Sequence, residues 1–170
     1  MKTTILPLLF ALFSSLLWLY GCSNDPINNQ QYYDMVANEK SLPENMHELA
    51  FKREETPHYQ YLVRMADNQS DFEDFWMLYE LIRQAPETHF KEKNVFFIGL
   101  HESGSCPSEI EKVEPDSEIM KITIATPDGN CTDDATPRTF VIQIDKAESK
   151  NLESVIIVEG GTETTVPLEK

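Results

Sequence analysis

The chain has 170 residues, enough for one ordinary domain and a short extension. It carries 14 Lys and Arg against 29 Asp and Glu, a formal net charge of −15, and this balance argues against nucleic acid or an anionic membrane surface as an electrostatic partner. Hydrophobic residues make up 41% of the chain, too many for a wholly disordered acidic protein.

The first 21 residues have the parts of a secretory signal peptide. Lys2 supplies a positive start, a mostly apolar run extends from Ile5 to Tyr20, and Gly21 gives a small exit before Cys22. As a helix the run would span roughly 24 Å, less than the roughly 30 Å of a hydrocarbon core. We predict a signal peptide over residues 1–21. A plain cleaved signal and an uncleaved N-terminal anchor are the alternatives.

The sequence Leu19-Tyr20-Gly21-Cys22 resembles the lipobox of bacterial lipoproteins. The resemblance implies that the Cys22 thiol receives a diacylglyceryl group, and that the membrane partner is reached through this lipid anchor. It also implies an extracytoplasmic location. Because Ser23 follows the cysteine, lipoprotein sorting by analogy favours the outer membrane facing the periplasm in a Gram-negative cell, and otherwise the outer face of the cell membrane. Cleavage before Cys22 removes Lys2 and no acidic residue, so the formal net charge of the mature chain is −16.

Residues 22–50 are predicted to be a polar tether, and residues 51–170 a single extracytoplasmic domain. The tether begins with a run of polar and turn-forming residues at 23–31. Scattered apolar residues at 32–37 and 46–51 leave open a short helix or a docking strand within it.

The first strong elements of the domain are a strand and a helix. Residues 59–66 alternate like a strand. The sequence Ser70-Asp71-Phe72-Glu73 then matches a capping box, and Pro86 is predicted to end the helix that follows. Apolar residues recur behind the box at helical spacing and predict one buried face. These residues are Phe72, Phe75, Trp76, Tyr79 and Ile82.

From residue 94 onward the pattern changes to short apolar runs and alternation. It predicts strands over 95–100, 109–113, 119–125, 139–145, 155–158 and 164–168. Gly160 and Gly161 allow a tight turn between the last two. The order of elements predicts an α+β fold, with one amphipathic helix packed on a mainly antiparallel β-sheet.

The three cysteines divide into an acylated one and a pair. If Cys22 carries lipid, Cys106 and Cys131 form a disulfide in a compartment that permits it. In the chain-entropy model, closing a loop of this length with a disulfide stabilises the folded protein by about 3.5 kcal/mol. A metal pair lacks CxxC spacing and nearby histidines, and a catalytic thiol would have only His101 near it in sequence.

Two segments contain candidate binding residues. The first joins two predicted strands and carries His101, Glu102, Ser103 and Ser105, which could serve a hydrolase but lack a Gly-x-Ser-x-Gly elbow. The second, 128–134, contains Asp128, Asp133 and Asp134 and is faintly similar to a calcium loop. Asp133 stands where such a loop needs glycine, so a turn followed by solvated acids is the favoured interpretation.

The order of strand, capped helix, Phe90-Lys91-Glu92-Lys93, apolar strand and Ser-Gly loop resembles a small extracytoplasmic bacterial domain family that is named for a component of a protease complex. The resemblance covers roughly residues 59–146. That family has a Thr-Gly-Gly-Tyr turn where this chain has residues 102–107. It has no established catalytic residues to carry over.

The sequence thus predicts a lipid-anchored, non-catalytic module that binds an envelope protein or another envelope component. Its expected contact surface is the pair of loops joined by Cys106 and Cys131, since binding residues favour loops on a rigid scaffold. We expect no cofactor, metal or nucleic acid. The alternatives are an envelope hydrolase using His101 with Ser103 or Ser105, and a calcium- or ligand-binding module at 128–134.

Overall fold

The computed structural model describes residues 32–168. The predicted signal peptide, the lipobox with Cys22 and the first part of the predicted tether lie outside the described residues. Within residues 32–168, no helix is long and apolar enough to cross a membrane.

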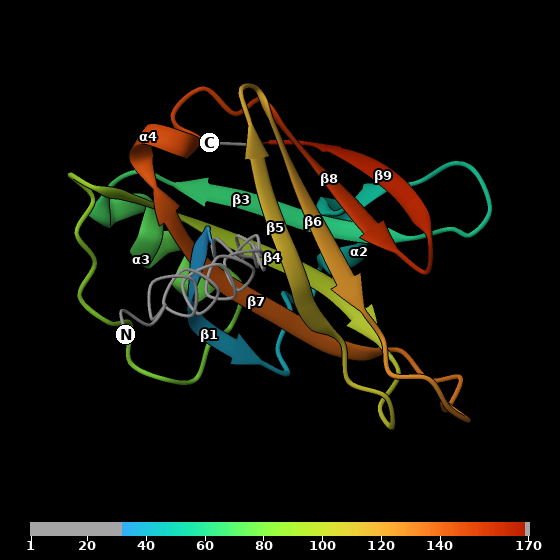
Figure 1. The fold of residues 1–170 in the computed structure, drawn as a ribbon. Helices are drawn as coiled ribbons and strands as arrows, with labels where there is room; N and C mark the ends of the chain where they lie inside the picture. Colours follow the sequence, from blue (N-terminus) through green and yellow to red (C-terminus); the bar gives the residue numbers. More distant parts are fainter. Residues whose placement is uncertain (1–31, 169–170) are drawn as a thin grey trace, which may run out of the picture. The chain divides into compact units, whose positions relative to one another are not determined.

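The described chain forms nine strands and three short helices (Figure 1). Their bounds are β1 Tyr33–Glu39, α2 Met46–Leu49, β2 Phe51–Lys52, β3 Gln60–Ala66, α3 Gln69–Leu78, β4 Lys93–Glu102, β5 Glu109–Asp116, β6 Ile119–Ala125, β7 Thr136–Asp145, α4 Lys146–Ser149, β8 Ser154–Glu159 and β9 Thr162–Pro167. One sheet has the order β1-β7-β4-β3-β2, and the other has the order β5-β6-β8-β9.

The five-stranded sheet is covered on both faces. One face packs against the four-stranded sheet, and the other packs against α2, α3 and the segment that follows α3. This explains why β4 has an unbroken run of buried residues from Asn94 to Leu100, where a strand with one wet face would alternate. Glycine stands at residue 99 in this run because a Cβ there would lie only 2.6 Å from Leu42 Cδ2 and 3.1 Å from Tyr79 Cε1.

The expected fold class is correct only in part, because the protein is mainly β. The predicted helical layer is present. The strands, however, form two sheets that pack on each other, where a single sheet was predicted. Most neighbouring strands are antiparallel, whereas β6 and β8 are parallel. A parallel neighbour needs a long crossover, and here the crossover passes through β7 and α4.

The predicted strands from residue 94 onward are all present, and several are longer than predicted. β4 and β7 each have ten residues. β5 continues through Pro115 to Asp116, and the chain turns at Ser117, which has a φ of 52°. Proline is tolerated there because β5 lies at the edge of its sheet.

The start of the folded domain was predicted too late. β1 lies inside the segment 22–50, and it pairs with β7 from Tyr33↔Ile144 to Glu39↔Thr139. Met46 of α2 is 4% exposed and belongs to the core beneath the helices. Ala37, Met46 and Ala50 of this segment are therefore core residues, whereas Met35 and Phe51 are exposed. The segment forms both a strand, β1, and a short helix, α2.

Helix α3 begins earlier than the predicted capping box. Asn68 is the N-cap, and its side-chain oxygen accepts a hydrogen bond from the Asp71 backbone N–H at 3.0 Å. Glu73 accepts from the Gln69 side chain at 2.7 Å and so makes no capping box with Ser70. Asparagine caps a helix as well as serine does, so the polar run offered two possible starts.

The same helix ends earlier than predicted, at Leu78 and well before Pro86. Glu80 has a φ of 54°, and this left-handed residue turns the chain out of the helix. Tyr79 remains fully buried and donates to the Leu62 carbonyl at 3.0 Å. Ile82 was predicted on the buried face but is 90% exposed, because the helix has already ended.

Two tyrosines connect the two sheets, one at the β1 and β5 edges and one between the inner strands β3 and β8. The Tyr33 hydroxyl of β1 donates to the Ile110 carbonyl of β5 at 3.0 Å. The Tyr61 hydroxyl of β3 donates to Glu159 Oε2 at the end of β8 at 2.6 Å. Burial raises the pKa of the Tyr61 phenol, and the hydrogen bond to Glu159 raises it further. Burial also raises the pKa of the Glu159 carboxyl, against the opposing effect of that hydrogen bond.

Replacing Phe97 should destabilise the protein more than any exposed change on α3. The Phe97 ring of β4 contacts the rings of four residues of this layer, Phe72, Phe75, Trp76 and Tyr79. We expect Phe97→Ala to lower the free energy of unfolding by about 3–5 kcal/mol, measured by urea denaturation. Met77→Ala, at a residue 68% exposed, is the control and should change it by less than about 0.5 kcal/mol. Equal losses in the two variants would contradict this packing.

Glu159→Gln should change how stability depends on pH. Because the folded-state pKa of Glu159 is raised above the ordinary 4.5, the stability contributed by this group is fully present below pH 4.5 and is lost as pH rises through the folded pKa. The free energy of unfolding of Glu159→Gln, relative to that of the wild type, should therefore rise between acidic and neutral pH. Urea denaturation across this range measures it. Glu163→Gln, at an exposed residue of β9, is the control, and a flat difference for Glu159→Gln would refute the expectation.

Candidate functional site

The candidate site is a pair of loops at one end of the five-stranded sheet. Residues 103–108 follow β4 and residues 126–135 precede β7, and we call these two segments the loop pair. β4 and β7 are neighbours with Glu102 opposite Thr136, so both loops leave the sheet at the same place. Figure 1 shows them projecting side by side beyond the strands.

The predicted disulfide is confirmed and joins the two loops. Cys106 is bonded to Cys131 with a Cα–Cα distance of 5.5 Å. Cys106 is buried, whereas Cys131 is exposed. The covalent bond therefore fixes the longer loop to the buried base of the shorter one.

A cluster of hydrogen bonds also holds the loops together. The Thr132 hydroxyl lies 3.1 Å from the hydroxyls of both Ser103 and Ser105, and the Thr132 backbone N–H donates to Ser105 Oγ at 2.8 Å. The Gly104 N–H donates to Asp134 Oδ1 at 2.9 Å. A Cβ at residue 104 would come so close to the Asp134 carboxylate that this side chain would have to shift.

The Asp134 carboxylate is the main acceptor of this cluster. It accepts from the Thr132 hydroxyl, the Gly104 N–H and, at 3.3 Å, the Thr136 hydroxyl. These hydrogen bonds, with that of Thr132 the strongest, hold the pKa of the Asp134 carboxyl below its ordinary value. The carboxylate is thus charged and engaged within the protein.

A buried ion pair fixes the base of the loop pair. Glu102 Oε1 accepts from Arg138 Nη2 at 2.6 Å, and Glu102 Oε2 accepts from the Ser108 N–H at 2.7 Å. Arg138 Nη1 in turn donates to Asn38 Oδ1 of β1 at 2.6 Å. The side chains of Glu102 and Arg138 are 0% and 9% exposed. The last residue of the shorter loop, Ser108, is therefore tied to the residue that precedes the loop, Glu102.

Within residues 32–168, the residues predicted for a hydrolase do not form a hydrogen-bonded set around His101. His101 is exposed on β4, whereas the next residue, Glu102, points into the protein. The hydroxyls of Ser103 and Ser105 interact with each other and with Thr132. Among the hydrogen bonds of residues 32–168, none links His101 to either serine. A serine nucleophile needs its base within about 3.2 Å, although this distance often shortens only in a complex.

The acids predicted for a calcium loop are likewise dispersed. Asp128, Asp133 and Asp134 are all exposed, and Asp134 accepts a hydrogen bond from Gly104 of the other loop. In the described part of the chain, no group of three or more His, Cys, Asp or Glu side chains is arranged to hold a metal ion.

Sequence reasoning missed Arg138 and Thr132. Arg138 lies 36 residues from Glu102 and Thr132 lies 27 from Ser105, so no local spacing pairs them. No local signal points to Arg138, because it precedes the predicted strand over 139–145 and has Pro137 and Thr139 as its neighbours.

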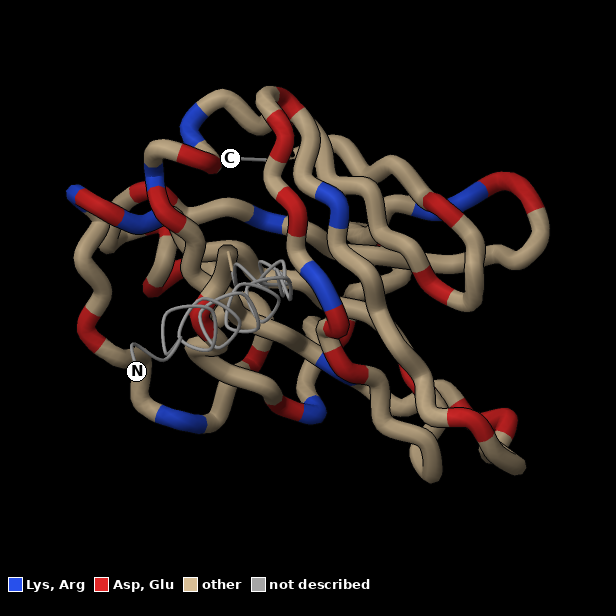
Figure 2. The backbone as a smooth tube through the Cα atoms, in the orientation of Figure 1, with Lys and Arg blue, Asp and Glu red and all other residues tan. Residues whose placement is uncertain are grey.

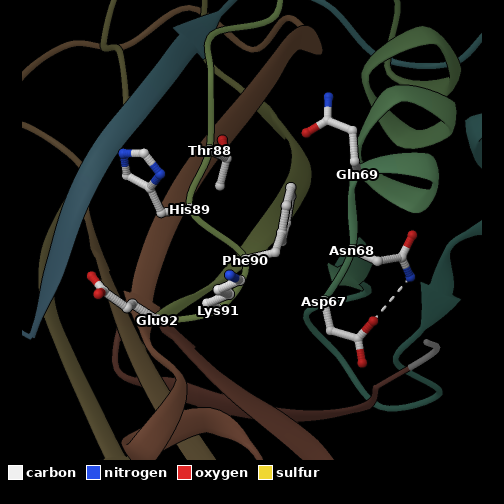
Figure 3. Close-up of a pocket in the computed structure, with 8 residues that line it drawn as sticks. All are labelled: Asp67, Asn68, Gln69, Thr88, His89, Phe90, Lys91 and Glu92. Carbon is white, nitrogen blue, oxygen red and sulfur yellow. Dashed lines mark hydrogen bonds between the residues drawn. The ribbon is translucent and has the colours of Figure 1, made fainter.

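A second hollow lies at the opposite end of the sheet, beside the start of α3 (Figure 3). It has a volume of about 710 Å³. Figure 3 shows Asp67, Asn68 and Gln69 on one wall and the segment 88–92 on the other. Lys146 Nζ donates to the carbonyls of Asp67 and Phe90, at 3.5 and 3.3 Å, and so joins the walls. On the first wall, Asn68 is the N-cap of α3, so its side chain is already engaged in the start of the helix.

Comparison of the chain with protein-family models, with curated proteins and with solved structures finds no match. The resemblances to a lipobox and to the domain family named for a protease-complex component therefore stay predictions. Function has to be argued from the residues and their geometry.

Breaking the buried ion pair should cost far more than breaking an exposed one. Glu102→Ala leaves Arg138 without its charged partner, and we expect a loss of about 3–5 kcal/mol in the free energy of unfolding. Glu163→Ala removes the exposed pair with Lys121, which has side chains 57% and 39% exposed, and should cost less than about 1 kcal/mol. Chemical denaturation of both variants measures this, and similar losses would show that the buried pair does not stabilise the base of the loops.

Proposed function

We propose that the protein is a lipid-anchored cell-envelope protein whose folded domain is a non-catalytic binding module. The loop pair is its contact surface. The observation that carries the proposal is the threefold fixation of these loops, by the disulfide, by the Asp134 and Thr132 hydrogen bonds and by the buried Glu102–Arg138 pair. Loops held in one conformation lose little conformational entropy on binding, which is the main advantage of a preorganised surface.

The chemistry of the loop pair suits a polar protein partner. Asp128, Asp133 and Asp134 contribute carboxylates, and neither loop contains Lys or Arg. Complementary charge on a partner would raise the association rate and fix its orientation. The backbone and hydroxyl groups between these acids can supply further hydrogen bonds.

The anchor is proposed from the sequence, and the loop pair from the geometry. The two parts agree, because a domain held by lipid at its N-terminal side can present a fixed loop surface to a partner in the envelope. No observation on the described residues favours the hydrolase or the calcium module over this function.

Cys22→Ser should release the protein from the membrane. In the wild type we expect Met1 to be absent and Cys22 to carry acyl chains, as measured by intact mass of the detergent-extracted protein. The variant should move to the soluble extracytoplasmic fraction, because two acyl chains provide stable anchoring and the acidic domain has no comparable attraction to anionic lipid. An unmodified Cys22 or a retained Met1 in the wild type would refute the anchor.

A photo-crosslinking residue in the loop pair should capture a partner that one on an outer sheet face does not. We place it at Asp128 in one variant and at the exposed Glu163 in the other. The captured protein, once purified, should bind the wild type more tightly than it binds Asp134→Ala or the double variant Cys106→Ser with Cys131→Ser, since both loosen the loops.

Circular dichroism checks that these variants are folded. Equal capture from both positions, or equal affinity for folded loop variants, would refute the proposed contact surface.

A further inference from the structure

We infer that the end of the domain at which β1 begins faces the membrane, and that the loop pair points away from it. The inference rests on the lipid anchor proposed above. It adds a membrane-facing surface and an orientation, neither of which follows from the presence of an anchor alone.

The linker between the proposed anchor and the fold is short. Ten residues, 23–32, separate Cys22 from the first residue of β1, Tyr33. A chain of ten residues reaches at most about 35 Å, and a random coil of that length spans roughly 17 Å on average. The beginning of β1 is therefore held close to the bilayer surface.

The strand register identifies the anchored end of the sheet. Tyr33 pairs with Ile144, one residue before the end of β7, and at this same end Lys93 begins β4 opposite Asp145. The loop pair leaves from the other end, where Glu102 lies opposite Thr136. β7 has ten residues, and such a strand is about 33 Å long. This length exceeds the average span of the linker, so the loops lie far from the anchor point.

Charge is distributed unequally between the two ends. The loop pair carries exposed acids without any Lys or Arg, as Figure 2 shows on the projecting loops. The end near the start of β1 has lysines among its acids. These lysines are Lys91, Lys93, Lys146 and Lys150. Lys93 offsets part of the acidic charge at this end by pairing with Asp34 and Asp145, whereas the loop pair has no Lys or Arg to offset its acids.

This orientation divides the surface of the protein by accessibility. The hollow between α3 and residues 88–92 lies at the anchored end, because it is built from the end of β3 and the approach to β4. In the inferred orientation the loop pair lies up to about one strand length farther from the bilayer than the start of β1. Its partner must therefore approach from the aqueous space and not from the lipid surface.

Energy transfer to labelled lipid tests the orientation on the full-length acylated protein. A fluorescent non-natural residue replaces Glu148 of α4 in one variant and Asp128 of the loop pair in the other; both are exposed acids. Each variant is reconstituted into vesicles of phosphatidylethanolamine and phosphatidylglycerol that contain an acceptor lipid labelled at the headgroup. We expect markedly higher transfer from position 148 than from position 128. A second version of each variant has a long Gly-Ser insertion after Asn28. In this version the difference in energy transfer between positions 148 and 128 should be smaller, because the longer linker no longer holds the domain in one orientation.

The outcomes separate the anchor from the orientation. Acylated protein that fails to float with the vesicles would overturn both. Floating protein with equal transfer from the two positions, or with higher transfer from position 128, would overturn the orientation and leave the anchor intact. An undiminished difference after the insertion would refute the role of the short linker.

Discussion

The antiparallel pairing of β4 with β7 is the interaction on which the rest of the structure depends. Ten residue pairs, from Lys93↔Asp145 to Glu102↔Thr136, place two long strands at the centre of the five-stranded sheet. Alternate side chains on both strands pack into the two cores on opposite faces of the sheet. Phe96 packs toward the second sheet, and Phe97 packs toward the helices. Neither outer layer could bury its apolar face without this ladder.

The same ladder connects stability to the proposed function. At its end the loop 103–108 leaves Glu102 and the loop 126–135 joins Thr136, so strand pairing sets the distance between these two loop ends. The buried carboxylate of Glu102, the disulfide and the Asp134 hydrogen bonds then fix the loops relative to one another. The other end of the ladder lies beside the start of β1, so the proposed contact surface and the first strand of the fold lie at opposite ends of this sheet.

The agreement between sequence and structure was best where local pattern decides. The strand over 119–125 has the predicted bounds, and its residues Met120, Ile122 and Ile124 are buried as their alternation indicates. Agreement failed at the ends of α3. Asn68 and Ser70 are residue types of nearly equal capping preference, so the sequence does not decide between them. The left-handed residue that ends the helix is Glu80 and not the glycine that would have indicated such a turn.

By itself, the sequence determined which segments are extended and which two cysteines are available to pair, because alternation and residue chemistry act over short distances. It also carries all the grounds for the lipid anchor. Only the tertiary structure decided that β6 and β8 run parallel, that β1 belongs to the sheet, and that Glu102 meets Arg138 while His101 faces solvent. These outcomes depend on contacts between residues far apart in the chain, and local preferences leave such contacts undetermined.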